Sequence, residues 1–440
     1  MSAKTLYTGG SSSVLFTDRR DFYPNPQKVM ELYKNANPLL KWLSAQSKLT
    51  NLTDPLFKQF ETRQYWVRQY LKVTTGATSA ADNAEDTLAV TVTGSKGLGT
   101  ALTNALVGHQ VEVFSPNAAG TAPGSTSKGV LVITTFTSVT SIGVKNLTGN
   151  SITIADNDWL EVIGNVHGEG TTAPNAWADE LQVVWGQCGI FKTSLELTET
   201  LKTAALRGDR NELARLRALK MAEHLVQKER AMLFSANQVG TNLGGSDTFS
   251  DGGRTDADGN VIRPTYGIIR ALVDYGSSTG DDKNVFEWSQ ADYDYDSFVD
   301  DAEQIFTYDF QDGSMKTMFA SAKVISFFHK IAASGFIGNS AMRVEISDMK
   351  TDELGLNYNT VKTPHGYIKM IHLPTLTKSP YNGFAFIPSA AHIVHAIYRP
   401  MTYKQNIKTD DAYDGQKDQI MSDEGMGFGL LESHKLIKLV

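Results

Sequence analysis

Short stretches that alternate apolar and polar residues dominate residues 81–175. They include LAVTVTG, HQVEVF, GVLVITTF and NSITIADNDWLEVIG, and Gly, Pro, Asn and Ser residues separate them. Such alternation is typical of strands with one buried face. The region holds only 3 Lys or Arg residues and 8 Asp or Glu residues, but 15 residues of the β-favouring type Thr. The pattern predicts a small all-β module built from hairpins.

The strongest helical pattern lies at residues 209–234, DRNELARLRALKMAEHLVQKERAMLF. Asp209 followed by Glu212 has the spacing of a capping box. From Leu213 onward, apolar residues recur at a spacing of three and form one slowly rotating stripe. This stretch predicts a single long amphipathic helix. Just before it, the alternation over residues 180–200 predicts one or two long strands.

Residues 266–400 predict a mixed α/β body. DSFVDDAEQIFTYDF and SAKVISFFHKIAAS favour helices, whereas KTMFA, GYIKMIHLP, NGFAFIP and AHIVHAIYRP favour strands. The tail to residue 440 predicts strands that return to an earlier sheet. Residues 1–50 predict an extended arm with one short helix, broken by Pro38. Because this arm buries little surface by itself, we expect it to lie on another body or another chain.

Composition and charge narrow the class of protein. The 440 residues are 41% hydrophobic and 20% charged, an ordinary globular balance. The single cysteine, Cys188, excludes a disulfide framework and favours a reducing compartment. The chain opens with no signal-peptide pattern, and its apolar runs are shorter than the roughly 18 residues that span a bilayer. We therefore predict a protein with no membrane partner.

Charge is distributed unevenly around the net value of −7. Residues 1–80 carry 11 Lys or Arg and 5 Asp or Glu, a local charge of +6, and the remainder carries 30 and 43, or −13. The basic leading segment is either an arm that meets acidic partners or a solvated face. The isoelectric point near 5.8 disfavours a broad nucleic-acid-binding surface.

The glycines of LAVTVTGSKGLGTALTNAL (88–106) suggest a nucleotide-binding loop, but their spacing excludes it. Gly94, Gly97 and Gly99 give G-x-x-G-x-G, whereas a dinucleotide fingerprint needs G-x-G-x-x-G after a strand and before a helix. Thr100 and Ala101 also replace the Lys and Ser/Thr of a phosphate loop. A glycine turn between hairpins is the favoured interpretation.

The candidate metal sites are equally incomplete. His392 and His395 are three residues apart in a predicted strand, where their side chains face opposite sides. Glu223-His224 lacks a second histidine one turn later. RTDADGN (254–260) resembles a calcium loop, but Arg254 stands at the first ligand position and no Glu at the twelfth, so a turn is favoured.

The remaining candidates favour structural roles. Cys188 lies in a β-type run and predicts a buried thiol. Arg207-Gly208-Asp209 spells an adhesion tripeptide but opens the predicted long helix. An acidic run predicts a helix N-terminus with a solvated face; it comprises Asp292, Asp294, Asp296, Asp300, Asp301 and Glu303. The sequence thus predicts no catalytic, cofactor-binding or metal site, and a structural role rather than an enzyme.

Three segments stand out when they are taken together with the order of the parts. They are VIGNVHGEGTTAPNAWADELQVVWGQCGIFKTSLELTETLK (162–202), ELARLRALKMAEHLVQKERAMLFS (212–235) and QIMSDEGMGFGLLESHKLIKLV (419–440). In these segments and in the order of its parts, the chain resembles the major capsid proteins of tailed bacteriophages, with the Hong Kong-97-type fold. The likeness is to a subgroup with a small β-barrel-like module inserted before the long spine helix. It implies an α+β fold with an N-terminal arm, an extended loop, and peripheral and axial domains.

The resemblance also implies domain boundaries. The arm would span 1–50, and the extended loop 51–190 with its β module at about 85–165. The peripheral domain would span 191–265, the axial domain 266–395, and the C-terminal strands 396–440 would return to the peripheral domain.

The implied function is self-assembly, as pentamers and hexamers, into an icosahedral shell around double-stranded DNA. A portal protein, and scaffolding and decoration proteins, are the other expected partners. The expected location is the virion, after assembly in the host bacterial cytoplasm. The alternative is a β-rich phage surface or fibre protein that binds host glycans, which would explain the β module but not the long helix.

Overall fold

A computed structural model describes most of the chain, in two compact units. The main unit comprises residues 1–61 and 183–440, and the inserted unit residues 62–182. The described residues are 37–46, 48–49, 52–62, 70–76, 78–79, 85–91, 106–118, 120, 123–175, 181–199, 212–236, 255–279, 283–307, 315–337, 350–351, 356–377, 380–407 and 415–440.

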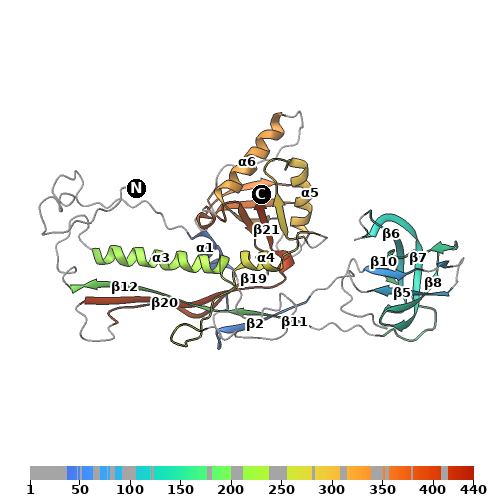
Figure 1. Cartoon of the computed structure of the whole chain (residues 1–440), viewed down its shortest axis with the longest axis horizontal. Coiled ribbons are helices and arrows are strands. Elements are labelled where there is room, and N and C mark those ends of the chain that lie inside the picture. Colours follow the sequence, from blue (N-terminus) through green and yellow to red (C-terminus); the bar gives the residue numbers. More distant parts are fainter. Residues whose placement is uncertain are drawn as a thin grey trace. The chain divides into compact units, whose positions relative to one another are not determined.

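The main unit holds two larger sheets, a two-stranded ribbon and the helices (Figure 1). Its elements are α1 (Pro38–Ala45), β1 (Lys48–Leu49), β2 (Leu56–Glu61), β11 (Gln182–Gln187), β12 (Gly189–Thr198), α3 (Glu212–Phe234), α4 (Ile268–Tyr275), β13 (Val285–Trp288), α5 (Tyr295–Phe306), β14 (Met315–Ala320), α6 (Ala322–Ile337), β15 (Lys350–Thr351), β16 (Asn357–Lys362), β17 (Tyr367–His372), η4 (Pro374–Leu376), β18 (Phe384–Ile387), β19 (Ile393–Lys404), β20 (Gly415–Phe428), η5 (Leu431–Ser433) and β21 (Lys435–Leu439).

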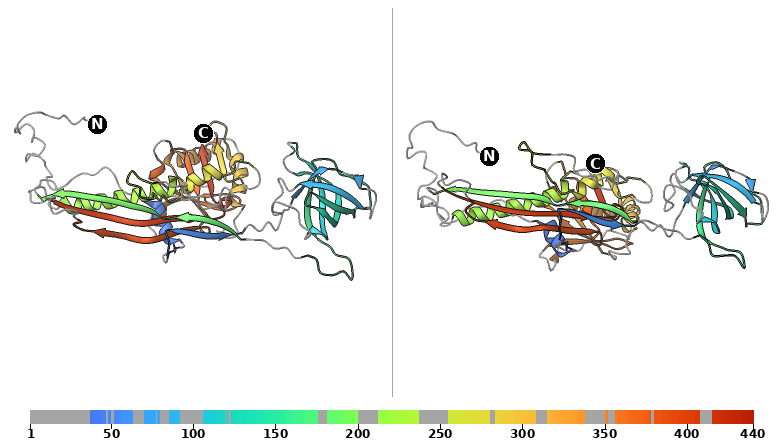
Figure 2. Two further views of the ribbon diagram at one scale, coloured as in Figure 1. Left: turned by 60° about the horizontal axis from the view of Figure 1, so that its bottom comes forward. Right: turned by 90° about the horizontal axis from the view of Figure 1, so that it is seen from below.

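The first sheet is long and four-stranded, in the order β1-β19-β20-β12. β20 is the central long strand, and it pairs antiparallel with β12 from Gly189↔Glu424 to Thr198↔Gly415. α3 runs along this sheet (Figure 2). The predicted long helix and the predicted strands at 180–200 are therefore confirmed, within the residues that the structure describes.

The second sheet has seven strands in the order β13-β21-β18-β14-β17-β16-β15. α5 and α6 cover one face, where Phe298 and Phe328 pack on Trp288. α1, α4 and the end of α3 contribute to the core on the other face. Successive residues of one strand enter different cores, as Leu436 and Ile437 of β21 do. A sheet covered on both faces explains why a strand such as β18, FAFI, is a continuous apolar run.

The C-terminal strands divide between the two larger sheets. β19 and β20 lie in the four-stranded sheet, whereas β21 pairs with β13 and β18 inside the seven-stranded sheet. Burial explains this position of β21, since Lys435, Leu436 and Ile437 are all enclosed and a strand with two buried faces needs a strand on either side.

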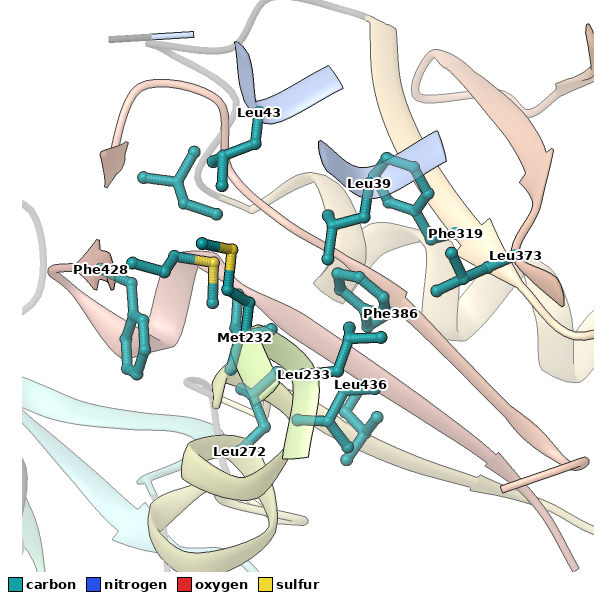
Figure 3. Packing of buried hydrophobic residues seen from close by; sticks show 14 of the residues in the cluster. Leu39, Leu43, Met232, Leu233, Leu272, Phe319, Leu373, Phe386, Phe428 and Leu436 are labelled. Carbon is teal, nitrogen blue, oxygen red and sulfur yellow. The ribbon is translucent and has the colours of Figure 1, made fainter. Parts of the chain in front are cut away.

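The helix α1 decides one alternative left open for the leading segment, which was expected to lie on another body or another chain. α1 itself is packed into the core of its own main unit. Leu39 and Leu43 lie among Met232, Leu233 and Phe386 (Figure 3), and the ring of Trp42 meets that of Phe319 edge-on at 5.5 Å. Five of the eight helix residues are buried, which explains how so short a helix is held.

The inserted unit is a closed six-stranded barrel in the order β10-β3-β5-β8-β7-β6. Its elements are β3 (Tyr70–Thr75), β4 (Thr78–Ser79), β5 (Glu85–Thr91), β6 (His109–Pro116), β7 (Pro123–Ser138), β8 (Ser141–Asn146), β9 (Ile152–Thr153) and β10 (Trp159–Asn165). The predicted all-β module is confirmed, but it begins earlier than residue 85. β3 is needed because it closes the barrel between β10 and β5.

We predict that residues 62–182, expressed alone, fold into a cooperative domain. The barrel has no open sheet edge and has its own core of fully buried side chains, such as Leu71 and Leu160. Leu160→Ala should lower the free energy of unfolding by about 2–5 kcal/mol, because it leaves a cavity. Ile163→Ala, at a side chain that is 49% exposed, should change it by less than about 1 kcal/mol.

Circular dichroism during urea unfolding measures both effects. A non-cooperative transition of the isolated segment, or equal losses in the two variants, would contradict the assignment of an independent core.

Candidate functional site

The residues that the sequence nominates for chemistry are not brought together. His392 Nδ1 forms a hydrogen bond with Ser433 Oγ (2.9 Å), whereas His395 Nε2 lies 2.8 Å from Glu424 Oε2. Glu223 forms a surface pair with Lys220. Within the described ranges, no group of three His, Cys, Asp or Glu side chains could hold a metal ion.

Two of the predicted turns and caps are confirmed. Asp256 accepts hydrogen bonds from the side-chain amide of Asn260 and from the backbone N–H groups of Asn260 and Asp258, and these bonds close a turn and lower the pKa of Asp256. Asp294 caps α5 by accepting from the Ser297 N–H. Gly94, Gly97 and Gly99, the tripeptide at 207–209 and Arg254 lie outside the described residues.

The cysteine is a structural thiol. Cys188 is completely buried between the ribbon β2–β11 and β19, and its Sγ lies 3.8 Å from the Ala396 carbonyl oxygen. Burial raises the pKa of the Cys188 thiol to about 12. A thiol that stays protonated at neutral pH is neither a nucleophile nor a good metal ligand.

The most unusual feature of the main unit is a row of buried and half-buried polar side chains between α3 and β20, which we call the polar seam. Arg217, His224 and Lys228 project from α3, seven and four residues apart, and therefore from one face. Opposite them, Asp418, Ser422 and Glu424 occupy alternate positions of β20 and share one face of the strand.

One end of the seam is a buried ion pair. Lys228 Nζ lies 2.9 Å from each carboxylate oxygen of Glu424, and both side chains are over nine-tenths buried. His395 on β19 contacts the same carboxylate. Burial favours the neutral acid, but hydrogen bonds from His395 and the charge of Lys228 outweigh it and lower the pKa of Glu424. The carboxylate therefore stays ionised.

The centre of the seam is uncharged. His224 is 1% exposed, and its ring nitrogens lie 3.0 Å from Thr193 Oγ1 on β12 and 3.1 Å from Ser422 Oγ. Burial and the neighbouring Lys228 charge lower the pKa of His224. The neutral ring thus joins the helix to two strands through both of its nitrogens.

The other end of the polar seam is the Asp418 carboxylate, which accepts hydrogen bonds from several groups. Asp418 receives the guanidinium of Arg217 at 2.9–3.0 Å, the hydroxyl of Tyr403 and the backbone N–H of Asn406. Burial raises the pKa of Asp418, but these hydrogen bonds outweigh it and lower that pKa to about 2. Each seam residue on α3 and β20 therefore has a partner, whereas Nδ1 of the buried His395 has none among the described residues.

The sequence contains a polar spacing that indicates the seam, but apolar periodicity does not reveal it. The residues at 217, 224 and 228 fall on one side of the predicted helix, and DQIMSDE places acids and a serine at alternate positions of the tail. Only the pairing of these two segments, about 200 residues apart, shows that the charges neutralise each other.

Comparison with known proteins identifies the kind of molecule. A family model described as SU10 major capsid protein matches residues 27–426, most of the chain. The chain belongs to the SU10 major capsid protein family. This match confirms the resemblance of the capsid protein to tailed-phage major capsid proteins, and with it the expected fold class. No curated protein sequence matches it.

The capsid protein also resembles solved structures at low similarity. A structure of Mycobacterium phage Bobi is 9% identical, covers 98% of this chain and 99% of that chain, and has a TM-score of 0.42. For Microbacterium phage Oxtober96 the identity is 7%, with the same coverages and TM-score. The mature capsid of bacteriophage PhiM1 is 9% identical over 63% of this chain and 79% of that chain, with a TM-score of 0.37.

Among the described helices of the capsid protein, none is long and apolar enough to cross a membrane.

We predict that Lys228→Met destabilises the capsid protein by about 3–5 kcal/mol, because it leaves the Glu424 carboxylate buried without its cation. The matched control is Lys220→Met, on the same helix but in an exposed pair with Glu223, which should cost less than about 1 kcal/mol. Chemical denaturation followed by tryptophan fluorescence distinguishes them. Equal losses of unfolding free energy in the two variants would show that the buried ion pair stabilises the protein no more than the exposed pair does.

We also predict that Cys188 does not react with a thiol reagent at pH 8 while the protein is folded. Its raised pKa and its burial leave almost no accessible thiolate. Mass spectrometry should find one modified cysteine only after denaturation, and rapid labelling of the folded chain would contradict the prediction.

Proposed function

We propose that this capsid protein assembles, as pentamers and hexamers, into an icosahedral shell that encloses the double-stranded DNA of a tailed phage. The observation that carries the proposal is the family match over residues 27–426. The role is structural rather than enzymatic. The protein resides in the virion after assembly in the host bacterial cytoplasm, with a portal protein and, where needed, scaffolding and decoration proteins as partners.

The two larger sheets suggest a division of labour. The four-stranded sheet with α3 would form the peripheral domain, at about 191–265 with the strands β19 and β20. The seven-stranded sheet with α5 and α6 would form the axial domain, at about 266–395 together with β21. The barrel would be the module carried by the extended loop at 51–190.

The end of the seven-stranded sheet is a candidate for contacts around the five- and six-fold axes. Met315 and Tyr367 are register partners at the start of the parallel strands β14 and β17, yet they are 57% and 45% exposed. Neighbouring exposed apolar side chains are typical of surfaces that another protein covers. The ten-residue strand β12 lies at the edge of the four-stranded sheet as far as the structure describes it and offers a second surface, because a strand at a sheet edge can accept another strand.

Charge suggests which segment meets DNA. Residues 1–80 carry a net +6, whereas the remaining chain carries −13. A basic leading segment on the inner face would lie against packaged phosphates.

The alternative of a glycan-binding fibre protein rests on the barrel alone. It gives no role to the polar seam or to the seven-stranded sheet, which together occupy most of the main unit.

We predict that the purified protein forms closed shells, visible by negative-stain microscopy. Met315→Asp combined with Tyr367→Asp should leave the subunit folded but reduce shell formation at least tenfold, because desolvating two carboxylates opposes the contact. Met315→Leu with Tyr367→Phe keeps the surface apolar and should retain assembly.

Sedimentation velocity quantifies the shells, and circular dichroism checks the fold. Elongated trimers would support the fibre alternative, and normal shells from the aspartate variant would remove this sheet end from the proposed contacts.

A further inference from the structure

The helix α1 lacks the cap that a short helix normally needs at its N-terminus. Asn37 occupies the N-cap position, but its side chain makes no capping hydrogen bond. Its Oδ1 is buried and has no partner among the described residues. The first backbone N–H groups of the helix must therefore find an acceptor elsewhere.

A distant carboxylate supplies that acceptor. Glu229, in the last third of α3, directs Oε2 to the Leu40 N–H at 3.4 Å and accepts from the Thr375 hydroxyl of η4 with Oε1 at 2.8 Å. The side chain is completely buried. A single carboxyl group therefore joins α3, α1 and η4.

No cation balances this carboxyl group. Glu229 takes part in none of the ion pairs formed by the described residues, and the adjacent Lys228 is held by Glu424. On α1 the single charged side chain, Lys41, is exposed, and η4 carries no charge. His372, at the end of β17 near η4, is partly desolvated, which lowers its pKa and favours its neutral form.

The geometry points to a conformational control: we propose that protonation of Glu229 determines how firmly α1 is attached to the main unit. Burial raises the pKa of Glu229 from 4.5 to about 7, although the hydrogen bonds from Thr375 and from the backbone of Leu40 and Leu39 oppose the rise. When α1 detaches, the carboxyl group meets water and regains its ordinary acidity. Attachment therefore takes up a proton.

The sign follows from this proton uptake. A group with a raised pKa in the attached state stabilises that state fully below pH 4.5 and loses this contribution as pH rises through 7. Attachment of α1 is therefore strongest in mild acid and weakens toward pH 8.

Hydrogen exchange of the α1 amides in the full-length protein tests this inference without requiring shells to form. After correction for intrinsic exchange rates, the opening equilibrium of α1 should increase on the order of thirtyfold between pH 5.5 and 8.5. The amides of α4, in the same core, provide the reference and should change much less. A pH-independent opening of α1 in the wild-type protein would overturn the proposal.

Three variants assign the effect to one carboxyl group. Glu229→Gln should abolish the pH dependence, whereas Glu223→Gln, on the exposed face of the same helix, should leave it unchanged. Thr375→Val removes a hydrogen bond that favours the ionised carboxylate and should shift the midpoint to higher pH. A persistent slope in Glu229→Gln, or an unchanged midpoint in Thr375→Val if the first variant does not fold, would refute the inference.

Discussion

A charge that leaves water must meet an opposite charge or a full set of hydrogen bonds, and this requirement fixes how α3 lies on the long sheet. Each polar residue on the inner face of the helix has its partner on β20 or a neighbouring strand. A shift of β20 by two residues would place Lys228 against Ser422 and leave Glu424 without its cation. Apolar packing tolerates such shifts, but the polar seam does not.

The same helix then connects two kinds of interior. Its middle is held by the seam, whereas Met232 and Leu233 at its end enter the apolar core behind the seven-stranded sheet. Glu229 lies at the transition, next to the ion pair in sequence but without a cation of its own. α3 therefore contacts the four-stranded sheet along its length and α1 and α4 near its end, and so fixes where these two helices lie relative to that sheet.

The sequence predicted those features that depend on local periodicity. The long helix, the hairpins of the barrel and the helices α5 and α6 all follow from spacings within one segment. Pairings between distant segments were not predictable: β21 carries an apolar pattern that suits either sheet, and only its two buried faces assign it to a place between β13 and β18 in the seven-stranded sheet. The sequence predicted α1 as part of an arm, because the residues that cover its five buried side chains are distant in the sequence.

The candidate site shows the same limit. His395 and Glu223-His224 were weighed as metal ligands from their own neighbours in sequence, and each proved to belong to a polar contact with another strand or to the surface. Local spacing alone was enough to predict that these residues form no metal site. Recognising the polar seam requires the register of β20 against β12 and the position of β20 against α3.

The barrel departs from the main unit and returns to it through β2 and β11, which are partners in one two-stranded ribbon. The two connections thus leave the main unit from adjacent strands. In genetic terms this makes residues 62–182 an exchangeable cassette: an unrelated domain whose ends lie close together could be inserted at the same point of the chain without altering the sheets and cores of the main unit.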